Sequence, residues 1–546
     1  ASARGGVDYF REHRLFSIAP GWIGGYPSYT GPGDFSRGGS EGNEIFATQT
    51  TTSTRLDAVR TIAGMKWNFA VGADVVGSRE RIRTAGVDSI LHVPSAGAPD
   101  TARVPPALLW TGHARETSAL GEAGVTLSNG ANVRVGLRNE WTSDVPGQHA
   151  SSLLPSVSAA IDLVRAVPSM RDCCYLSAAT LRGSLWRDAG DLSPYVAQTM
   201  YAGGSAGGSV APAGGSPLVA DVNLEPELTT GWEIGADLAL EAPRISLGFT
   251  AYSEKTSGVI LPVSDGLVAR NAGEIRNRGI EGSLTSRMGN GDVGFQWDLT
   301  LNAGRNSNEV LSLIDNVQSI PLGPSQWGLS VEARRGLPLG ALVGRRMLRD
   351  VNGALLLRDG LPLPDSVRGA EYLGDALGKG TLGVRSSLRY RWVTASIAAD
   401  GRFGGHVYSG TNLWGSYSGV LEATAFRPDS GLLIAGVDAT TGQANATHVT
   451  TQDYYHALAA IQEPWVYSAS FFKIRDARLS FTLPSRSRTL PFQGASVSLV
   501  VRNLYTWANA PNIDPETIFS VYQLPGVEMG QLPSTRSIGI QLTVTP

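Results

Sequence analysis

The chain has 546 residues, of which 66 are glycine and 17% are charged, and its formal net charge is −3. A soluble chain of this length normally divides into several cores, and so small a charge gives no support to nucleic-acid binding. The two cysteines, Cys173 and Cys174, are adjacent, which excludes a disulfide framework and a CxxC metal site. Abundant glycine between short apolar segments is typical of a large all-β protein, and no run of about 18 apolar residues predicts a membrane-spanning helix.

Alternation of apolar and polar residues predicts a series of strands along the chain. In 293–304, Phe295 and Trp297 lie on one face and Gln296 on the other. Such segments approach the roughly 9 to 11 residues that a tilted strand needs to cross a bilayer. In chain order, the clearest of them are 231–240, 244–254, 277–287, 293–304, 381–391, 393–403 and 537–545.

The chemistry of the two faces favours a membrane barrel. Alternation alone also fits a soluble sandwich with one wet face. The apolar faces are almost free of charge, however, and a charge on a lipid-facing surface costs roughly 2–4 kcal/mol at the bilayer midplane. Aromatic residues near strand ends are typical of girdles at membrane interfaces, although each could be an ordinary core residue; they are Trp232, Tyr252, Tyr390, Trp392 and Trp507.

The connections between the predicted strands are of two kinds. Short turns at 241–243 and 288–292 contrast with long segments of irregular sequence at 18–45, 188–222, 305–378 and 404–465. Long loops are unusual in a compact soluble domain but normal on one side of an outer-membrane barrel. The sequence therefore predicts an all-β, transmembrane, antiparallel up-and-down β-barrel with long extracellular loops and roughly 14 to 16 strands.

A series of motifs runs from about residue 133 to the C-terminus. Asn-Leu-Glu-Pro-Glu at 223–227 precedes Trp-Glu-Ile-Gly at 232–235, and Arg-Asn-Ala-Gly-Glu-Ile-Arg-Asn-Arg-Gly-Ile-Glu stands at 270–281. In this order the motifs resemble those of SusC/RagA-type TonB-dependent outer-membrane transporters. Residues 1–546 are identified as the C-terminal part of such a receptor barrel, most clearly over 133–546. The other motifs stand at 154–158, 181–184, 193–195, 470–484, 502–507, 514–516 and 533–536.

The motif residues are expected to serve the architecture rather than chemistry. Glycine and asparagine tolerate turn and left-handed conformations, which predicts such positions for Asn271, Gly273, Asn277 and Gly279. By parity along their strands, Glu233 and Glu281 face the lumen. The remaining motif residues with expected structural roles are Asn223, Pro226, Glu227, Trp232, Glu274, Asn503, Leu504 and the rigid loop of Asp514, Pro515 and Glu516.

The resemblance implies a barrel of about 22 strands with an N-terminal plug folded inside, which imports glycan fragments or peptides across the bacterial outer membrane. It also implies outer-membrane lipids and a SusD-like surface lipoprotein as partners, and the TonB complex if a plug-bearing N-terminus exists. Nucleic acid is not an implied partner. We recognise no plug, TonB-contact segment or carboxypeptidase-like domain in the sequence, so we expect a fragment of a longer receptor in preference to a truncated relative.

Other functions are compatible with the same kind of membrane barrel. An unplugged passive pore and a structural or accessory barrel subunit of a membrane complex are the alternatives. A siderophore receptor is a near neighbour, but the Asn-Ala-Gly-Glu-Ile motif at 271–275 favours the SusC type. An enzyme is not expected, because the seven histidines are scattered and no HExxH, GxSxG or P-loop pattern occurs. The sequence implies no cofactor and no metal.

Two groups of residues are candidates for contact with a transported substrate. Exposed aromatic side chains in the long loops could stack on sugar faces, and these are Tyr408, Trp414, Tyr417, Tyr454 and Tyr455. Arg385, Arg389 and Arg391 could line the passage; alternatively, they form a lumenal network with acids of neighbouring strands.

Overall fold

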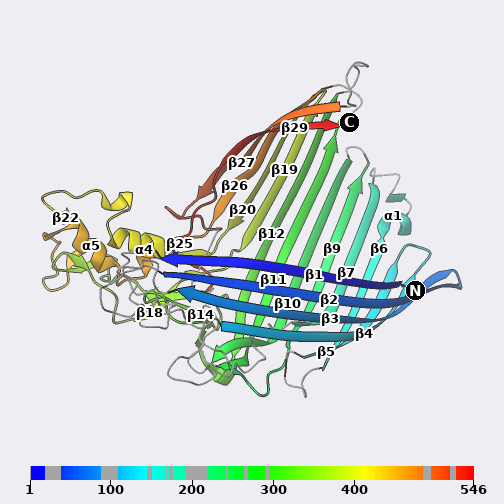
Figure 1. The fold of residues 1–546 in the computed structure, drawn as a ribbon, viewed down its shortest axis with the longest axis horizontal. Coiled ribbons are helices and arrows are strands. Elements are labelled where there is room, and N and C mark those ends of the chain that lie inside the picture. The colour runs from blue at the N-terminus through cyan, green and yellow to red at the C-terminus, as the bar shows by residue number, and fades with distance from the viewer. Residues whose placement is uncertain are drawn as a thin grey trace, which may run out of the picture.

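The computed structural model describes residues 2–18, 39–87, 108–143, 145, 151–167, 169–170, 176–190, 219–241, 244–263, 268–289, 294–483, 494–516 and 524–545. One sheet of 17 strands forms most of this part of the chain (Figure 1). No helix among the described residues is long and apolar enough to cross a membrane. The adjacent cysteines, Cys173 and Cys174, lie outside the described residues.

The large sheet is an antiparallel meander. Apart from the two-residue strand β8 (Val219–Ala220), each strand pairs antiparallel with the next long strand along the chain. The 16 long strands agree with the predicted range. They are β1 (Ser2–Ile18), β2 (Gly39–Ile62), β3 (Met65–Val87), β4 (Leu108–Thr126), β5 (Asn132–Thr142), β6 (Ser151–Asp162), β7 (Leu176–Gly190), β9 (Glu227–Leu240), β10 (Arg244–Val263), β11 (Val268–Met288), β12 (Phe295–Leu313), β19 (Gly380–Tyr390), β20 (Val393–Phe403), β26 (Phe471–Leu483), β27 (Gly494–Ala508) and β29 (Ser537–Thr545).

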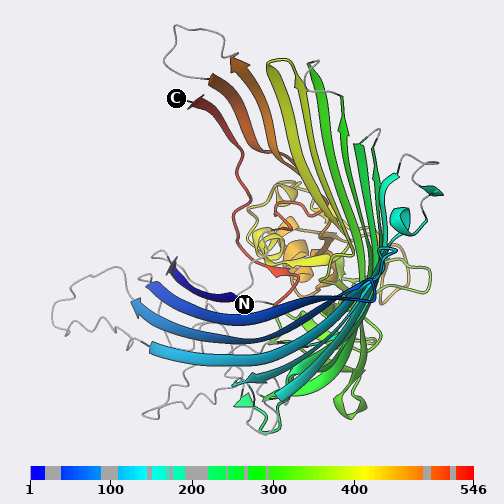
Figure 2. The ribbon, with the colours of Figure 1, turned by 90° about the vertical axis from the view of Figure 1, so that its right-hand side faces the viewer.

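The sheet curves into an open arc (Figure 2). Among the described residues, β1 pairs only with β2, and β29 pairs only with β27, so these strands form the two edges of the arc. The short helix α1 (Leu163–Ala166) follows β6, and the Asp162 carboxylate caps it by accepting from the backbone N–H groups of Val164 and Arg165.

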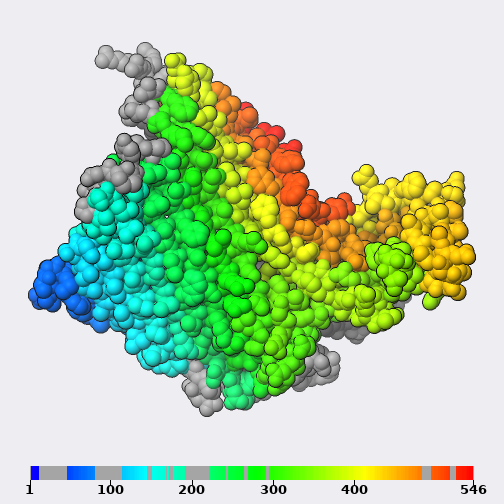
Figure 3. Space-filling view, turned by 180° about the vertical axis from the view of Figure 1, so that it is seen from behind, coloured from blue at the N-terminus to red at the C-terminus, as the bar shows by residue number. Residues whose placement is uncertain are grey.

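The two faces of the arc differ in chemistry. Asp237 and Thr250 point to the concave face, whereas their neighbours Ile234 and Phe249 point to the convex face and are 61% and 51% exposed. Large exposed apolar side chains recur along the outward parity of β9 to β12, β19, β20, β26 and β27. Figure 3 shows the convex face, beyond one end of which a folded region of the loops projects.

Aromatic side chains gather on the convex face at the ends of the strands that meet in short turns. The registers pair Phe295 with Tyr390, and the Trp392 ring packs at a tilt against Phe481, with ring centroids 5.7 Å apart. This is the arrangement expected of an interfacial girdle. Tyr252 is an exception to the prediction, because it points to the concave face, where its hydroxyl donates to the Asn306 side chain at 3.2 Å.

The seven segments that alternation marked most clearly are strands, but nine of the 16 long strands were not among them. Strands β19 and β20 match the predicted 381–391 and 393–403 to within a residue. Strands β1 to β4, which occupy much of the first 126 residues, were not among the segments that alternation marked.

Two of the four long segments expected to be irregular are folded. Residues 314–375 and 406–468, here called the loop domain, contain four small sheets and two helices, so the expectation of irregular structure is wrong there. The elements are η4 (Ile314–Asn316), β13 (Ser319–Pro321), β14 (Ser330–Arg334), β15 (Ala341–Arg345), β16 (Leu356–Arg358), β17 (Leu361–Pro362), β18 (Ala370–Asp375), β21 (His406–Ser409), α4 (Gly410–Tyr417), η5 (Glu422–Thr424), β22 (Leu432–Leu433), β23 (Val437–Asp438), β24 (His448–Val449), α5 (Thr451–Leu458), η6 (Glu463–Trp465) and β25 (Val466–Ser468).

The loop domain has its own apolar core and helix caps. Leu329, Leu342 and Leu413 belong to one buried cluster. The hydroxyls of Ser409 and Thr450 cap α4 and α5 by accepting from the third N–H group of each helix. The loop domain is therefore an ordered body at one end of the barrel wall (Figure 1).

A connection between β27 and β29, here called the tie segment (509–516 and 524–536), joins the wall to the loop domain. Within it, β28 (Val527–Glu528) pairs in parallel with β21. The fully buried Glu528 carboxylate accepts from the Ser409 and Thr411 hydroxyls and from the Thr411 backbone N–H group. A buried carboxylate thus stabilises the start of α4.

Candidate functional site

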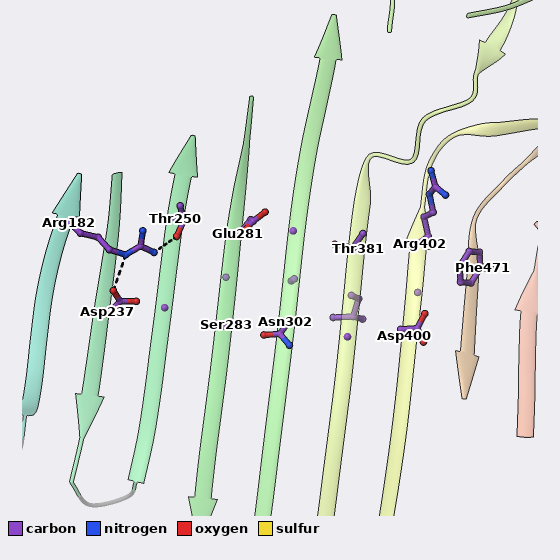
Figure 4. A pocket seen from close by; sticks show the side chains of 17 residues that line it. Arg182, Asp237, Thr250, Glu281, Ser283, Asn302, Thr381, Asp400, Arg402 and Phe471 are labelled. Carbon is purple, nitrogen blue, oxygen red and sulfur yellow. Dashed lines mark hydrogen bonds and ion pairs between the residues drawn. The ribbon is translucent and has the colours of Figure 1, made fainter. Parts of the chain in front are cut away.

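The strand registers bring polar residues from eight strands together on the concave wall. One row runs Arg182, Gly235, Thr250, Glu281, Gly304, Thr381, Arg402 and Phe471 from β7 to β26. The adjacent row runs Thr180, Asp237, Gly248, Ser283, Asn302, Gly383, Asp400 and Lys473 over the same strands. Most members of the two rows line a hollow of about 590 Å³ (Figure 4).

Glycine residues on neighbouring strands leave space for the large side chains of this wall. A Cβ on Gly235 would lie 2.6 Å from the Arg182 guanidinium carbon, and one on Gly248 would lie 2.6 Å from the Ser283 hydroxyl oxygen. Gly304 separates Glu281 from Thr381 in the row, and a Cβ there would approach the Thr381 hydroxyl to 3.2 Å. The alternation of glycine with polar residues therefore leaves a hollow with a polar floor.

Most charges around the hollow are paired. Arg182 donates to Asp237 at 3.0 Å, to the Thr250 hydroxyl at 2.6 Å and to Glu233, as Figure 4 shows in part. Asp400 accepts two hydrogen bonds from Arg475, at 2.5 and 2.8 Å. These pairs hold the side chains in fixed positions along the wall.

A buried ion cluster fixes the tie segment to the wall beside the hollow. Lys473 is 1% exposed, and its ammonium donates to both Asp514 oxygens at 2.7 and 2.6 Å and to Glu516 at 2.7 Å. Arg475 also donates to Glu516. Burial raises the pKa of Asp514, but hydrogen bonds from Lys473 and Ser534 outweigh it and hold this pKa below its usual value. Arg475, followed by Lys473, lowers the pKa of Glu516.

The motif residues at 271–279 do not occupy turns. Asn271, Gly273, Asn277 and Gly279 lie inside β11, and none has a positive φ, so the expected turn role is wrong. Asn271 instead fastens the chain before β9, because its amide donates to the Glu225 and Gly258 carbonyl oxygens and accepts from the Glu225 N–H group.

The other motif residues have local roles in the wall. Glu227 accepts from the Ile260 N–H group at 2.7 Å, and Glu274 bonds Lys255 at 3.0 Å. Asn503 has a φ of 50° at a bulge between β26 and β27 and donates to the Thr535 carbonyl oxygen. Registers place Glu233 and Glu281 on the concave face, in agreement with parity. Trp232 is 41% exposed on the convex face. Asn223 and Pro226 lie just before β9, and Leu504 lies in β27. Pro515 is buried in the tie segment.

The aromatic residues proposed for substrate contact lie in the loop domain, but one is not exposed. Tyr408 is fully buried in the core cluster, so the expectation of an exposed side chain is wrong; burial raises the pKa of its hydroxyl. Trp414 and Tyr417 are 37% and 40% exposed, with ring centroids 5.5 Å apart. Tyr454 and Tyr455 are partly buried and pack edge to face.

The three arginines proposed for the lumen differ in position. Arg385 pairs in register with Thr300 and so points to the concave face, two residues from Gly383. Arg389 shares this parity and donates to Gln296 at 2.6 Å. Arg391 instead lies in the turn between β19 and β20, with a φ of 53°, and its guanidinium lies over the outward Tyr390 ring, which overturns its expected lumenal position.

Sequence reasoning missed most of the hollow. Parity along β11 predicted the lumenal position of Glu281, but alternation within one strand does not give the register that aligns this residue with Arg182 and Arg402. Within the described residues, no group of three or more His, Cys, Asp or Glu side chains could hold a metal ion.

A meandering wall with an apolar convex face, an aromatic girdle and a polar concave face defines an outer-membrane β-barrel protein. The family described as "TonB dependent receptor-like, beta-barrel" matches residues 1–334, so the chain belongs to this family. The match includes the first 130 residues, where no family motif was recognised. Members reside in the bacterial outer membrane, as predicted, and are receptors rather than enzymes.

Individual relatives agree with this assignment. The chain is 25% identical to TonB-dependent receptor P3 of Formosa agariphila over 332 residues, which are 54% of this chain and 31% of that one. It is 24% identical to TonB-dependent receptor SusC of Bacteroides thetaiotaomicron over 332 residues, 55% of this chain and 30% of that one. The chain thus spans less than a third of these relatives.

A solved structure shows the same fold over nearly the whole chain. The RagAB peptide transporter superposes with a TM-score of 0.71 and 15% identity, covering 99% of this chain and 59% of the transporter chain. The same complex in its "open-open" state gives a TM-score of 0.70.

Proposed function

We propose that this chain forms the wall of a TonB-dependent channel that imports an organic nutrient, either glycan fragments or peptides, across the outer membrane. The observation that carries the proposal is the polar, glycine-floored hollow on the concave face, opposite an apolar convex face. Such a wall offers water-soluble cargo hydrogen bonds inside and presents hydrocarbon to lipid outside. Membership of the TonB-dependent receptor family supports energised import over a passive pore or an accessory barrel subunit.

Site-specific blocking tests the concave face as the passage. Ser283→Cys places a thiol in the hollow, and Leu284→Cys places one on the opposite face, both in the native full-length protein with Cys173 and Cys174 replaced by Ser. A bulky maleimide on residue 283 should reduce uptake of fluorescent oligosaccharide or oligopeptide mixtures at least tenfold, whereas the same label on residue 284 should not. Equal uptake by both labelled variants would exclude this wall as the passage.

We propose that a SusD-like lipoprotein covers the loop domain. The segment 420–433 exposes three large apolar side chains, Val420 at 76%, Phe426 at 70% and Leu433 at 54%. Exposed apolar groups of this kind mark protein interaction sites, and the family resemblance supplies the class of partner. Phe426→Asp should reduce co-purification of a SusD-type lipoprotein from solubilised outer membranes, whereas Val351→Asp, at an exposed position outside this segment, should not. Unchanged recovery with Phe426→Asp would remove this surface from the interface.

The half-exposed rings of α4 and α5 are proposed as first contacts for cargo. Trp327, Trp414, Tyr417 and His456 form a continuous series of ring contacts, with Tyr417 stacked on His456 at 4.0 Å. Trp414→Ala with Tyr417→Ala should weaken nutrient binding by removing a stacking face. Binding at the wild-type level would show that these rings only pack the loop domain.

A further inference from the structure

A second hollow lies on the convex face of the wall, the face shown in Figure 3. Its volume is about 410 Å³, and residues of β19, β20, β26 and β27 line it. Ala395 is opposite Leu388 on one neighbouring strand and Leu479 on the other, so its small side chain leaves the space between two leucines open. Strands β12 and β29 flank these four strands. Chain that fills the barrel interior or extends the sheet at its edges would therefore not cover this hollow.

The hollow lies at the depth of lipid acyl chains. Strand β19 ends at Tyr390 and β20 begins at Val393, so a short turn joins them, and short turns of outer-membrane barrels face the periplasm. Leu388 and Ala395 are each three residues from this turn, or about 10 Å along a strand. The apolar band of such a barrel is about 25 Å tall, so the hollow belongs to its periplasmic half. The periplasmic leaflet of an outer membrane consists of phospholipids, whose acyl chains meet the hollow.

Aromatic rings and a cation stand between the hollow and the periplasm. Tyr390 follows Leu388 on the outward face of β19, and Phe481 follows Leu479 on that of β26. The exposed Arg391 lies in the turn with its guanidinium over the Tyr390 ring, 5.4 Å from the ring centroid. A guanidinium at the membrane interface is placed to donate paired hydrogen bonds to a lipid phosphate group.

The backbone of Arg391 has a conformation that suits glycine better than arginine. Its φ of 53° lies in the left-handed region, where a side chain costs free energy. Its N–H group donates to the Gly294 carbonyl oxygen at 2.7 Å, and a Cβ on Gly294 would approach the Arg391 Cγ to 3.3 Å. The stem of the side chain is thus held against β12. Strain of this kind at a residue with a fixed side chain points to a role for that side chain.

We propose that the convex hollow and Arg391 together bind one anionic phospholipid of the periplasmic leaflet. One acyl chain lies in the hollow across Ala395, and the phosphate group accepts hydrogen bonds from Arg391. The rings of Tyr390 and Phe481 pack against the glycerol region between chain and phosphate. A zwitterionic lipid with a choline headgroup fits the hollow equally well, but its ammonium is repelled by the guanidinium.

Native mass spectrometry of the detergent-purified, native full-length protein tests the charged part of the site. The probes are dioleoyl-phosphatidylglycerol and dioleoyl-phosphatidylcholine. The first phosphatidylglycerol should bind about tenfold more tightly than the first phosphatidylcholine, which is the gain expected of one charge-assisted contact. Arg391→Gly should bind the two lipids equally, whereas Arg391→Lys should keep most of the preference.

A substitution that fills the hollow tests its apolar part. Ala395→Leu should weaken the binding of both lipids about tenfold, because it displaces roughly two methylene groups of the acyl chain. Ala123→Leu is the matched control and should change neither affinity. Ala123 is also exposed on the convex face, three residues before the end of β4 at a short turn and opposite the outward Phe69 and Val135.

Several outcomes would overturn the proposal. Equal affinity of the wild-type protein for the two lipids would do so, as would unchanged lipid binding in Ala395→Leu or an equal loss in Ala123→Leu. A dimer in the same spectra that Ala395→Leu dissociates, with lipid binding unchanged, would assign the hollow to a contact between copies. The heat-modifiable band in electrophoresis checks that the variants assemble. If one does not, the comparison of the two lipids on the wild-type protein still decides.

Discussion

At the scale of single residues, the buried ammonium of Lys473 holds the tie segment against the wall through two ion pairs. It lies 1% exposed between Asp514 and Glu516 and ties the chain before β29 to the wall. Lys473→Met removes the charge and takes the ammonium away from the buried Asp514 carboxylate, which still accepts from the Glu516 N–H group and the Ser534 hydroxyl. Breaking one side of a buried pair costs roughly 3 kcal/mol, so amide hydrogen exchange in the tie segment should accelerate about a hundredfold.

A matched control uses an exposed pair. Arg287 is 58% exposed and bonds Asp298 at 2.6 Å. Arg287→Met should cost less than about 1 kcal/mol and leave exchange in the tie segment unchanged. If the two substitutions had equal effects on the tie segment, the Lys473 cluster would not be what holds it.

The stability that this cluster gives the tie segment should fall in acidic solution. The pKa values of Asp514 and Glu516 are depressed below 3.8 and 4.5 in the folded protein. Their contribution to stability is therefore fully present at neutral pH and is lost as the pH falls below these values. Exchange protection of the tie segment, corrected for intrinsic rates, should be level from pH 8 to about 5 and decline in more acidic solution. A decline that begins above pH 6 would point to another group.

At the scale of elements, strand β11 shows why glycine recurs in the wall. A Cβ on Gly279 would lie 2.6 Å from the Tyr252 hydroxyl and would also meet the Arg305 carbonyl oxygen. Gly279→Ala should therefore reduce the yield of assembled barrel, measured as the heat-modifiable band in electrophoresis. Gly121→Ala in β4, where no atom lies within 4 Å of the new Cβ, should assemble normally. Normal assembly of both variants would show that the wall relaxes around residue 279.

The elements also show what the sequence could and could not predict. Strands β19 and β20 were found to within a residue, because apolar and charged residues alternate in them without interruption. Strand β2 was missed because its run of threonines, at 48 and 50–52, carries both a methyl and a hydroxyl and fits either face. The strands of the loop domain have two to six residues, too few to show a period of two.

The hollow was predictable only in part for a related reason. Parity gave the face of Glu233 and Glu281 correctly, since it depends on one strand alone. The row that joins Glu281, Thr381 and Arg402 depends on registers across four strands, and a slip of one residue would send each side chain to the other face. Tyr408 was misplaced because its burial comes from loop-domain packing, which leaves no periodic signal.

At the scale of the whole molecule, the chain is a wall with a polar concave face and an apolar convex face. We propose that the complete protein uses the concave face of this wall for energised import. The most direct measurement follows uptake of labelled oligosaccharide and oligopeptide mixtures by cells of the native host, with and without the gene, before and after an uncoupler collapses the proton gradient. The account predicts gene-dependent uptake that the uncoupler abolishes. Gene-dependent uptake that the uncoupler does not change would contradict it and establish a passive pore.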